Sequence, residues 1–375
     1  MVTNANQPRH NAIDDHAQRF SWLGRKVFLT GHTGFKGGWL ALWLAKLGAE
    51  VRGYALDPST DPALFNTARV GSVIEDIRGD IRDGASLQRA VQEFSPEVVF
   101  HLAAQPLVRA SYDDPIGTYE TNVIGTARLL DTVRRTPSVR ALVSVTTDKC
   151  YENKEWVWPY RETDPLGGYD PYSSSKACAE IVTAAYRQSY FPVEKLGRPG
   201  GHMVAVATAR AGNVIGGGDW SVDRLLPDLV RGFLSGEPVL IRRPHAIRPW
   251  QHVLEPLHGY LRLAERLLTH EARFATAYNF GPIEDDAKPV AWIADRMTGF
   301  WGGGASWVLD EAPSPHEAGY LKLDASRART DLQWTPKLRL EGALEFLVQW
   351  YKAWQDGSDM HAFTLEQIER YETLL

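Results

Sequence analysis

The chain has 375 residues, of which 44% are hydrophobic and 23% charged, with a formal net charge of -5 and two cysteines, Cys150 and Cys178. This composition is typical of a globular protein with one large α/β unit or two packed domains, and the charge gives no reason to expect nucleic acid or an anionic membrane as a partner. Two cysteines exclude a disulfide framework and suit a reducing, cytoplasmic compartment, and no apolar stretch reaches the ~20 residues that a bilayer-spanning helix needs.

The N-terminal part divides into a polar extension and a strand–turn–helix unit. Residues 1–20 carry no apolar signal-peptide core, so we expect a loose extension there. Residues 27–30 form a short apolar strand, and apolar residues then recur at Leu40, Trp43 and Leu44 with the period of a buried helix face. A glycine-rich turn therefore joins a strand to an amphipathic helix.

Each glycine of this turn has a separate role. Gly31 permits the tight turn, Gly34 lets the backbone approach a phosphate, and Gly37 lets the helix pack against the strand. The helix start adds unpaired N–H groups and a positive dipole end. The turn predicts a dinucleotide site whose cofactor contacts include Thr33, Phe35 and Lys36; a Walker phosphate loop does not fit, because Lys36 precedes neither Ser nor Thr.

The next units repeat the alternation of strand and helix. We expect strands at residues 50–55, 77–81, 97–102, 141–146 and 203–209, and helices at 114–135 and from Asp170-Pro171, a capping residue followed by proline at the first helical position. The cofactor contacts predicted at strand ends and on the first of these helices are Asp57, Asp80, Ile81, Leu102, Ala103, Ala104, Asn122 and Thr146. Asp57 either accepts hydrogen bonds from ribose hydroxyls, which favours NAD over NADP, or is a loop aspartate before Pro58.

This alternation predicts an α/β fold, with a Rossmann-type doubly wound parallel sheet. We expect residues 21–209 to form the NAD-binding domain and to carry the catalytic residues. Beyond Arg210 the glycines, prolines and arginines increase up to a final amphipathic helix near residues 341–354. We therefore expect residues 210–375 to form a smaller, mixed α/β domain that mainly binds the substrate.

Two groups of residues carry the predicted chemistry. Tyr172 and Lys176 lie four apart on one helix, so they share a face. A nearby ammonium, together with bound oxidised nicotinamide, lowers the pKa of a phenol, which can then take a proton from a sugar hydroxyl. Thr147, Asp148 and Lys149 follow the strand at 141–146, and chemistry in open parallel sheets collects at this carboxyl edge.

The sequence resembles the extended short-chain dehydrogenase/reductase superfamily at Gly31-x-x-Gly34-x-x-Gly37, Asn122 and Tyr172-x-x-x-Lys176. Within it, residues 29–37, 146–151, 212–220 and 320–324 resemble the CDP-glucose 4,6-dehydratases, and the resemblance runs from about Trp22 to Trp354. It implies an NAD-dependent hydro-lyase of deoxysugar biosynthesis that converts CDP-glucose to CDP-4-keto-6-deoxyglucose, with no metal, and a homo-oligomer, either a dimer or a tetramer.

The resemblance also implies roles for the residues. Tyr172 deprotonates the C4 hydroxyl while hydride leaves C4, Thr147 holds the C4 oxygen, and Asp148 protonates the departing C6 hydroxyl, for which burial must raise its pKa. Lys149 replaces the glutamate base of the dTDP-glucose dehydratases. It is either a C5 base with a depressed pKa or a cation that stabilises the enolate.

The nucleotide sugar requires a second set of contacts. Arg248 and Arg210 are the candidate diphosphate ligands, because guanidinium groups bind phosphate oxygens in a bidentate manner. Asn213 and Gln105 are further substrate contacts and Arg231 a weaker one, whereas Arg242 and Arg243 are expected to be solvated. Tyr320 and Glu317 lie where the subfamily closes over the base.

Three alternatives remain open at this point. An epimerase shares NAD and the Tyr/Lys pair but does not need the Asp148-Lys149 couple. Another 4,6-dehydratase would act on a UDP-, GDP- or dTDP-linked sugar. A redox sensor that binds NAD without turnover is the non-enzymatic alternative, although such sensors often lack the Tyr/Lys pair.

Overall fold

The computed structural model describes residues 20–269, 272–310 and 319–375. Of the expected N-terminal extension, residues 1–19 lie outside this part, and Phe20 packs edge-on against Trp22 with 5.2 Å between the ring centroids. Glu317 also lies outside the described residues. None of the helices in the described ranges combines the length and the apolar character that a bilayer-spanning helix needs.

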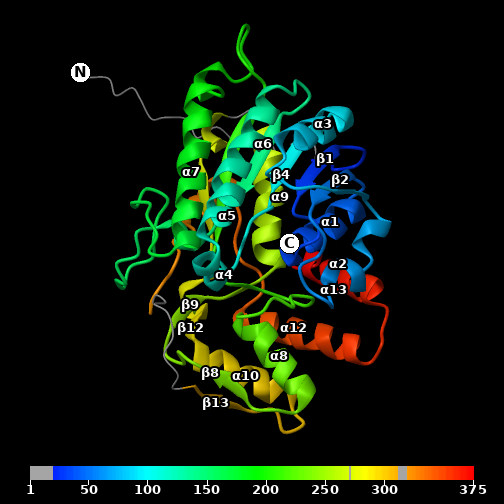
Figure 1. Ribbon diagram of the computed structural model, residues 1–375, viewed down its shortest axis with the longest axis vertical. Coiled ribbons are helices and arrows are strands. Elements are labelled where there is room, and N and C mark those ends of the chain that lie inside the picture. The colour runs from blue at the N-terminus through cyan, green and yellow to red at the C-terminus, as the bar shows by residue number, and fades with distance from the viewer. Residues whose placement is uncertain (1–19, 270–271, 311–318) are drawn as a thin grey trace, which may run out of the picture.

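A parallel sheet of seven strands forms the centre of the described structure (Figure 1). Its order is β11 (Ala277–Phe280), β6 (Ala205–Ala211), β5 (Ala141–Val145), β4 (Val98–His101), β1 (Lys26–Thr30), β2 (Glu50–Ala55) and β3 (Glu75–Arg78). The chain winds outward in both directions from β1 and β4, so the strand order reverses between these two. The predicted doubly wound fold is confirmed, and its switch point is where such sheets bind ligands.

Side chains of alternate strand residues point to opposite faces of the sheet and divide the core in two. Val27 and Leu29 of β1 belong to one hydrophobic cluster, whereas Phe28 between them belongs to the other. Because both faces are covered, the central strands β4 and β5 are buried along their whole length and are mostly apolar.

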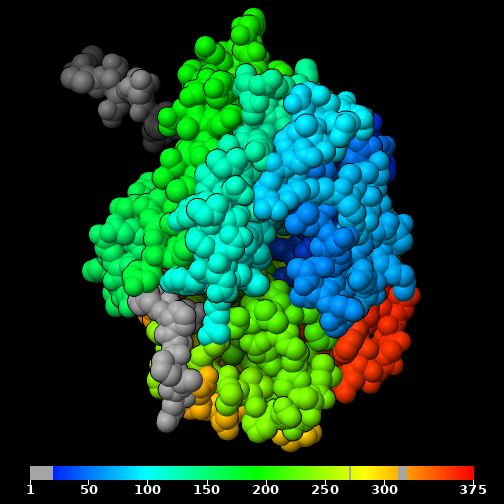
Figure 2. Space-filling model, in the orientation of Figure 1, coloured from blue at the N-terminus to red at the C-terminus, as the bar shows by residue number. Residues whose placement is uncertain are grey.

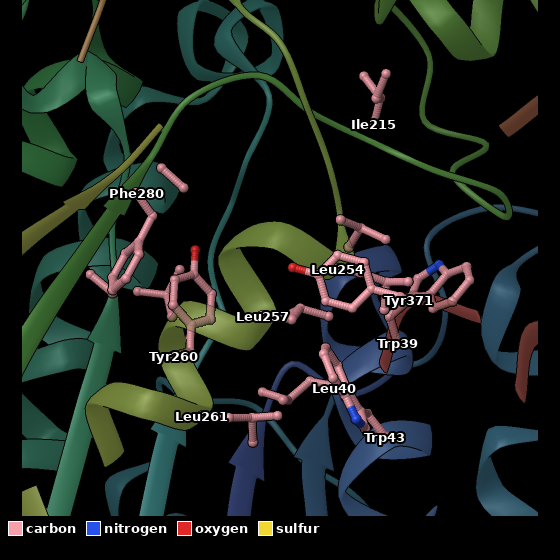
Figure 3. Close-up of a cluster of buried hydrophobic side chains, with 14 of the residues drawn as sticks. Trp39, Leu40, Trp43, Ile215, Leu254, Leu257, Tyr260, Leu261, Phe280 and Tyr371 are labelled. Carbon is pink, nitrogen blue, oxygen red and sulfur yellow. The ribbon is translucent and has the colours of Figure 1, made fainter. Parts of the chain in front are cut away.

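The helices cover both faces of the sheet. On the first face α1 (Phe35–Lys46) and α9 (Leu254–Leu268) contribute Trp39, Leu40, Trp43, Leu254, Leu257, Tyr260 and Leu261 to one buried cluster (Figure 3). Behind α1 lies α13 (Met360–Glu372), which packs near α12 (Leu340–Gln355). The second face carries α3 (Gly84–Phe94), α6 (Gly125–Arg134) and α7 (Pro171–Ser189). Short helices α2 (Leu64–Thr67), α4 (Val108–Asp113) and α5 (Pro115–Tyr119) complete this part.

A smaller group of elements lies below the sheet, around α8 and α10 (Figure 1). It consists of β7 (Val214–Ile215), α8 (Leu225–Ser235), β8 (Val239–Ile241), β9 (Ile247–Pro249), β10 (Gln251–His252), β12 (Ala287–Pro289), α10 (Val290–Trp301) and β13 (Trp307–Leu309). The chain does not stay there after residue 210, because α9 and β11 return to the main sheet and α11 (Ser326–Leu332) packs beside them. Residues after the expected boundary at 209/210 therefore belong partly to the smaller group of elements and partly to the main sheet.

Three predicted elements differ from the structure. The helix expected at 114–135 is interrupted by one π-type turn at Glu120–Ile124, between α5 and α6, which carries Asn122. The helix at 341–354 is present as α12 but is followed by α13, so it is not the last one. The third strand ends at Arg78 rather than at residue 81, because Gly79 and Asp80 leave the sheet towards the helix cap at Asp83.

A buried carboxyl in the first turn of α9 predicts a pH-dependent stability. Glu255 accepts the backbone N–H groups of Lys337 and Leu338 at 2.9 and 2.6 Å and the Tyr371 hydroxyl at 2.9 Å, yet burial raises its pKa to about 7. The folded state therefore binds a proton more tightly than the unfolded state, so this group's contribution is largest below pH ~4.5 and falls as the pH rises to about 7. Relative to Glu255→Gln, which cannot ionise there, the wild type should lose about 2 kcal/mol of unfolding free energy between pH 5 and pH 8 in urea titrations. A difference that stays constant with pH would contradict this prediction.

Candidate active site

A large cavity opens at the carboxyl edge of the sheet, where the switch point lies. Its volume is about 610 Å³, and it is lined by residues of the glycine turn, the ends of β2, β4 and β5, the start of α7 and the elements around α8. Figure 2 shows the surface recess where the blue, cyan and yellow-green parts of the chain meet. One cavity thus joins the predicted cofactor and catalytic regions.

The glycine turn fits a dinucleotide phosphate. A Cβ on Gly31, whose φ is +81°, would lie 2.7 Å from the Ala103 backbone nitrogen, and one on Gly37 would lie 2.1 Å from the Gly31 carbonyl oxygen. At Gly34 the nearest atom would be 3.4 Å away, so this glycine leaves its open side to the cavity. The helix α1 starts there without a capping side chain and without an acidic residue in its first turn, so its free N–H groups suit an anion.

The cavity brings together most of the residues predicted to touch the cofactor or take part in the chemistry. Its wall includes Gly31, Thr33, Gly34, Phe35, Lys36, Gly37, Asp57, Asp80, Ile81, Leu102, Ala103, Ala104, Thr146, Thr147, Asp148, Lys149, Tyr172 and Lys176, and of the predicted substrate contacts Asn213 and Arg248. Asp57 lies at the solvent side, with its side chain 90% exposed. Asp80 is engaged by the Arg82 guanidinium, which holds the pKa of that carboxyl below its usual value.

Asp148 has the environment that a general acid needs. It lies just after β5, is 2% exposed, and accepts the Thr147 hydroxyl on Oδ1 at 3.0 Å. Its Oδ2 has no hydrogen-bond partner among the described residues. Burial raises the pKa of this carboxyl, and the positive charges of Lys149 and Arg248 only partly oppose the shift. The protonated form is thus favoured in a group that still has a free oxygen to offer.

Tyr172 and Lys176 lie on the first turns of α7, which starts as predicted with the Asp170 side chain accepting the Ser173 N–H at 2.8 Å. The Lys176 ammonium donates to the Val145 carbonyl at the end of β5, at 3.4 Å, and burial lowers its pKa to about 8. The lowered pKa expected for the Tyr172 phenol is not found in the protein without its cofactor. Burial raises the pKa of Tyr172 to about 12, against the opposing hydrogen bond with Thr147 and the charge of Arg224.

Basic side chains gather on the wall opposite these groups. Arg248 is 6% exposed and lines the cavity together with Arg109, Arg224, Arg242 and Arg243. Arg224 is held by Asp219 at 2.9 Å, and Arg109 by Asp223 at 2.8 Å. Lys36, in the first turn of α1, lines the same cavity and is half-buried; desolvation together with the charges of Arg224 and Lys176 lowers its pKa to about 7. This wall is suited to a diphosphate.

Five predicted contacts do not line the cavity. The prediction of Arg210 as a diphosphate ligand is wrong in this structure, because its guanidinium is buried against Glu180 and Tyr151. Arg231 is occupied by the carbonyl groups of residues 220 and 221 and by the side chain of residue 228. Asn122 and Gln105 bond to each other's segments and to neighbouring side chains rather than facing the cavity. Tyr320 lies outside the wall, where its backbone forms a bridge with Ile247.

Part of the basic wall was not predicted from the sequence. Arg224 stands alone before an apolar helix, and nothing in its neighbourhood distinguishes it from a surface arginine. Arg242 and Arg243 were expected to be solvated, yet both line the cavity. Both residues directly follow β8 (Val239–Ile241). This position indicates a cavity contact only when β8 is known to lie across the cavity from the main sheet.

Gly212 lies close to Asp148, so we expect a larger side chain at this position to lower the activity. A Cβ there would lie 3.0 Å from Asp148 Oδ2 and 2.4 Å from Pro249 Cγ, so Gly212→Ala must displace one of them. We expect kcat to fall about 10-fold or more, because a shift of this size misaligns a catalytic group, and the melting temperature to fall as well, because the rigid Pro249 ring must move. Gly299→Ala on α10, where nothing lies within 4 Å, is the matched control. Equal activity of the two variants would contradict the placement of Asp148.

The fold and this site define a nucleotide-cofactor enzyme of the short-chain dehydrogenase/reductase type. The model of the NAD dependent epimerase/dehydratase family matches residues 27–281, so the chain belongs to this family and uses NAD. It is 53% identical over 350 residues to the CDP-glucose 4,6-dehydratase of Salmonella typhimurium, and this match covers 93% of this chain and 97% of that protein. It is 27% identical to the dTDP-glucose 4,6-dehydratase of Xanthomonas campestris pv. campestris, over 93% of this chain and 98% of that one.

Solved structures share the fold. The UDP-glucose 4-epimerase of Thermotoga maritima, with UDP-glucose, matches with a TM-score of 0.75 and 21% identity over 88% of this chain and 99% of that one. The dTDP-glucose 4,6-dehydratase of Bacillus anthracis, in complex with NAD, matches with a TM-score of 0.72 and 23% identity over 89% and 99%. At these identities the likeness shows the fold alone.

Proposed function

We propose that the chain is a CDP-glucose 4,6-dehydratase, which removes water from CDP-glucose to give CDP-4-keto-6-deoxyglucose. The observation that carries this proposal is Asp148, a buried carboxyl with a free oxygen in the same cavity as Tyr172. An epimerase does not need such an acid, whereas a dehydratase must protonate a leaving hydroxyl. The 53% identical relative supports the same reaction and the same nucleotide.

The residues act in sequence on one hexose. The glycine turn with Gly31, Gly34 and Gly37 would hold NAD, which would supply a hydride acceptor for C4 and, once reduced, a hydride donor for C6. Tyr172 takes the proton of the C4 hydroxyl, with Thr147 beside it to hold the oxygen. The resulting ketone acidifies the C5 hydrogen, which is lost as a proton while Asp148 gives its proton to the C6 hydroxyl and water leaves. Hydride addition at C6 then leaves an enolate, which takes up a proton at C5 to give the product. Lys176 anchors the end of β5 next to Tyr172.

Lys149 lies on the cavity wall beside Asp148 and is assigned to the loss of the C5 proton. It acts either as the base or as the cation beside the enolate, and substitution separates these roles. Arginine cannot serve as a base because its pKa is above ~12. If Lys149 is the base, Lys149→Arg and Lys149→Met should both lower kcat about 100-fold; if it is the stabilising cation, only Lys149→Met should do so. Full turnover in Lys149→Met would show that the residue is dispensable.

The diphosphate is assigned to the basic wall. Arg248 is retained from the sequence prediction, and Arg224 and Arg242 are added because they line the same cavity. Asn213 can donate its amide near them. We further propose that residues 21–209 bind the cofactor and carry the catalytic residues, while the elements around α8 and α10 bind the nucleotide sugar. The homo-oligomer and the cytoplasmic location remain predictions.

A panel of sugar nucleotides tests the proposal. The protein is incubated with CDP-, UDP-, GDP- and dTDP-glucose, and the 4-keto product is measured by mass spectrometry. We expect CDP-glucose to give the 4-keto product at the highest rate of the four. Product from another nucleotide sugar but none from CDP-glucose would overturn the cytidine assignment, and no product from any of them would overturn dehydration.

A further inference from the structure

A buried ion pair lies behind the active site, outside the cavity wall. Arg210 Nη2 on β6 lies 2.8 Å from Glu180 Oε2 on α7, and the two side chains are 4% and 3% exposed. Glu180 follows Lys176 by one helical turn. Replacing such a buried pair by apolar side chains is often neutral or stabilising, so stability alone is a weak reason for it.

Glu180 links α7 to the strand end that carries the acid. Its Oε1 accepts the Thr146 hydroxyl at 2.5 Å and its Oε2 accepts the Thr208 hydroxyl at 2.7 Å. Thr146 directly precedes Thr147 and Asp148. The carboxylate therefore fixes the spacing between the helix of Tyr172 and the strand end of Asp148.

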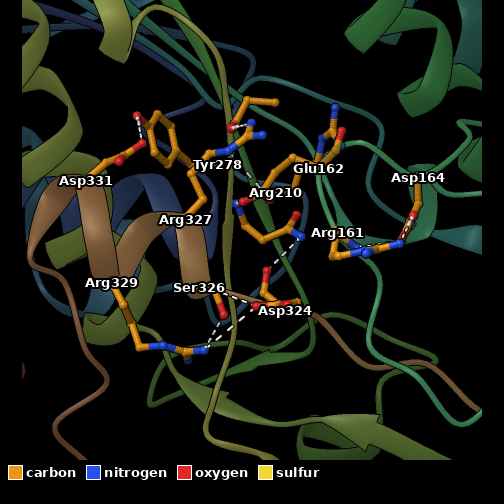
Figure 4. A network of polar contacts seen from close by, with 12 residues as sticks. Arg161, Glu162, Asp164, Arg210, Tyr278, Asp324, Ser326, Arg327, Arg329 and Asp331 are labelled. Atoms are coloured by element: carbon orange, nitrogen blue, oxygen red, sulfur yellow. Dashed lines mark hydrogen bonds and ion pairs between the residues drawn. The ribbon is translucent and has the colours of Figure 1, made fainter.

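Arg210 holds the other side of the same turn. Its Nη1 donates to the Tyr151 hydroxyl at 2.8 Å, and its guanidinium lies over the Tyr151 ring at 5.1 Å from the centroid. Tyr151 in turn donates to Asn279 on β11 at 2.7 Å. Figure 4 shows Arg210 between Glu162 and the polar groups around Tyr278 and Arg327, so its position is fixed from several elements.

We propose that the Glu180–Arg210 pair is a positioning device for the catalytic turn, because it clamps residues 147–150 at both ends: through Thr146 before the turn and through Tyr151 after it. This inference rests on the proposed function, since it concerns the alignment of Asp148 with Tyr172. Glu180 and Arg210 do not line the cavity. They act on the reaction only by positioning Asp148 and Tyr172, which do line it.

Two threonines on one carboxylate provide a matched test. Thr146→Val and Thr208→Val each remove one buried hydroxyl that donates to Glu180, but only Thr146 adjoins the catalytic turn. Thr146 also lines the cavity, so NAD affinity is measured in both variants to separate positioning from a lost cofactor contact. We expect similar losses of melting temperature in both variants. In Thr146→Val kcat should fall about 10- to 100-fold with the KM for CDP-glucose within about 3-fold and NAD binding retained, whereas Thr208→Val should stay near the wild type. Thr146→Ser, which keeps the hydroxyl, should restore most of the activity.

Loss of the whole pair extends the test. Glu180→Gln combined with Arg210→Met leaves no unpaired buried charge, so the double variant should fold and still lose kcat rather than KM. Equal kcat in Thr146→Val and Thr208→Val, with an active wild type, would overturn this inference alone. A wild type that forms no product from any sugar nucleotide would overturn the proposed function, and the inference would fall with it.

Discussion

Replacement of Tyr172 by phenylalanine is expected to lower kcat by about 10³-fold, because the phenylalanine ring has no oxygen that can take the C4 hydroxyl proton. The ring and its buried packing are kept, so the melting temperature and NAD binding should change little. The phenol pKa of about 12 in the chain by itself comes from burial. The positive charge of an oxidised nicotinamide would favour the phenolate.

The measurement is the absorbance of reduced nicotinamide after substrate is mixed with the NAD-loaded enzyme. Tyr172→Phe should give none, since the first oxidation is blocked. Tyr186→Phe, on the same helix and away from the cavity wall, should behave as the wild type. Reduced cofactor at the wild-type rate in Tyr172→Phe would contradict the assignment of the base.

Asp148→Asn should stop the reaction one step later. The amide keeps the shape of the side chain and can still accept the Thr147 hydroxyl, but it has no acidic proton to give. The C4 oxidation should therefore proceed, while overall kcat falls 10²- to 10⁴-fold as elimination is blocked. Substrate should convert the enzyme to a form with reduced nicotinamide that persists.

Two further observations check the role of Asp148. Because burial raises the pKa of its carboxyl, the elimination step in the wild type should slow as the pH rises through that pKa and the proton is lost. Asp131→Asn on the surface of α6, where the carboxylate pairs with Arg134, is the control that should change nothing. An Asp148→Asn variant that never reduces the cofactor would instead assign Asp148 to the first step.

The sheet and the catalytic groups were predictable from local patterns. Gly31, Gly34 and Gly37 are set by backbone geometry, and Tyr172 and Lys176 by helical spacing, so short stretches of sequence contain the information. The strand ends at Thr147 and Asp148 follow from the rule that parallel sheets place their carboxyl ends at one edge. All of these residues line one cavity.

The substrate wall was less predictable, because it depends on contacts between distant segments. The guanidinium of Arg210 could bind a diphosphate, but it forms a buried ion pair with Glu180, thirty residues earlier in the chain. Arg224 and Arg242 look like surface residues until α8 and β8 are placed opposite the sheet. The π-type turn at Glu120–Ile124 was also missed: Asn122 there bonds to the backbone of Gln105 and to Ser175, neither of which is close in sequence.

The central claim is that one hydride is borrowed from C4 and returned to C6 of the same sugar within one turnover. The most direct test is CDP-glucose labelled with deuterium at C4, converted by the NAD-loaded enzyme and analysed by mass spectrometry and NMR. We predict a 4-keto-6-deoxy product that has lost the C6 oxygen and carries the deuterium at C6. A product without the label, or recovery of a C4 epimer that keeps its C6 hydroxyl, would contradict this account.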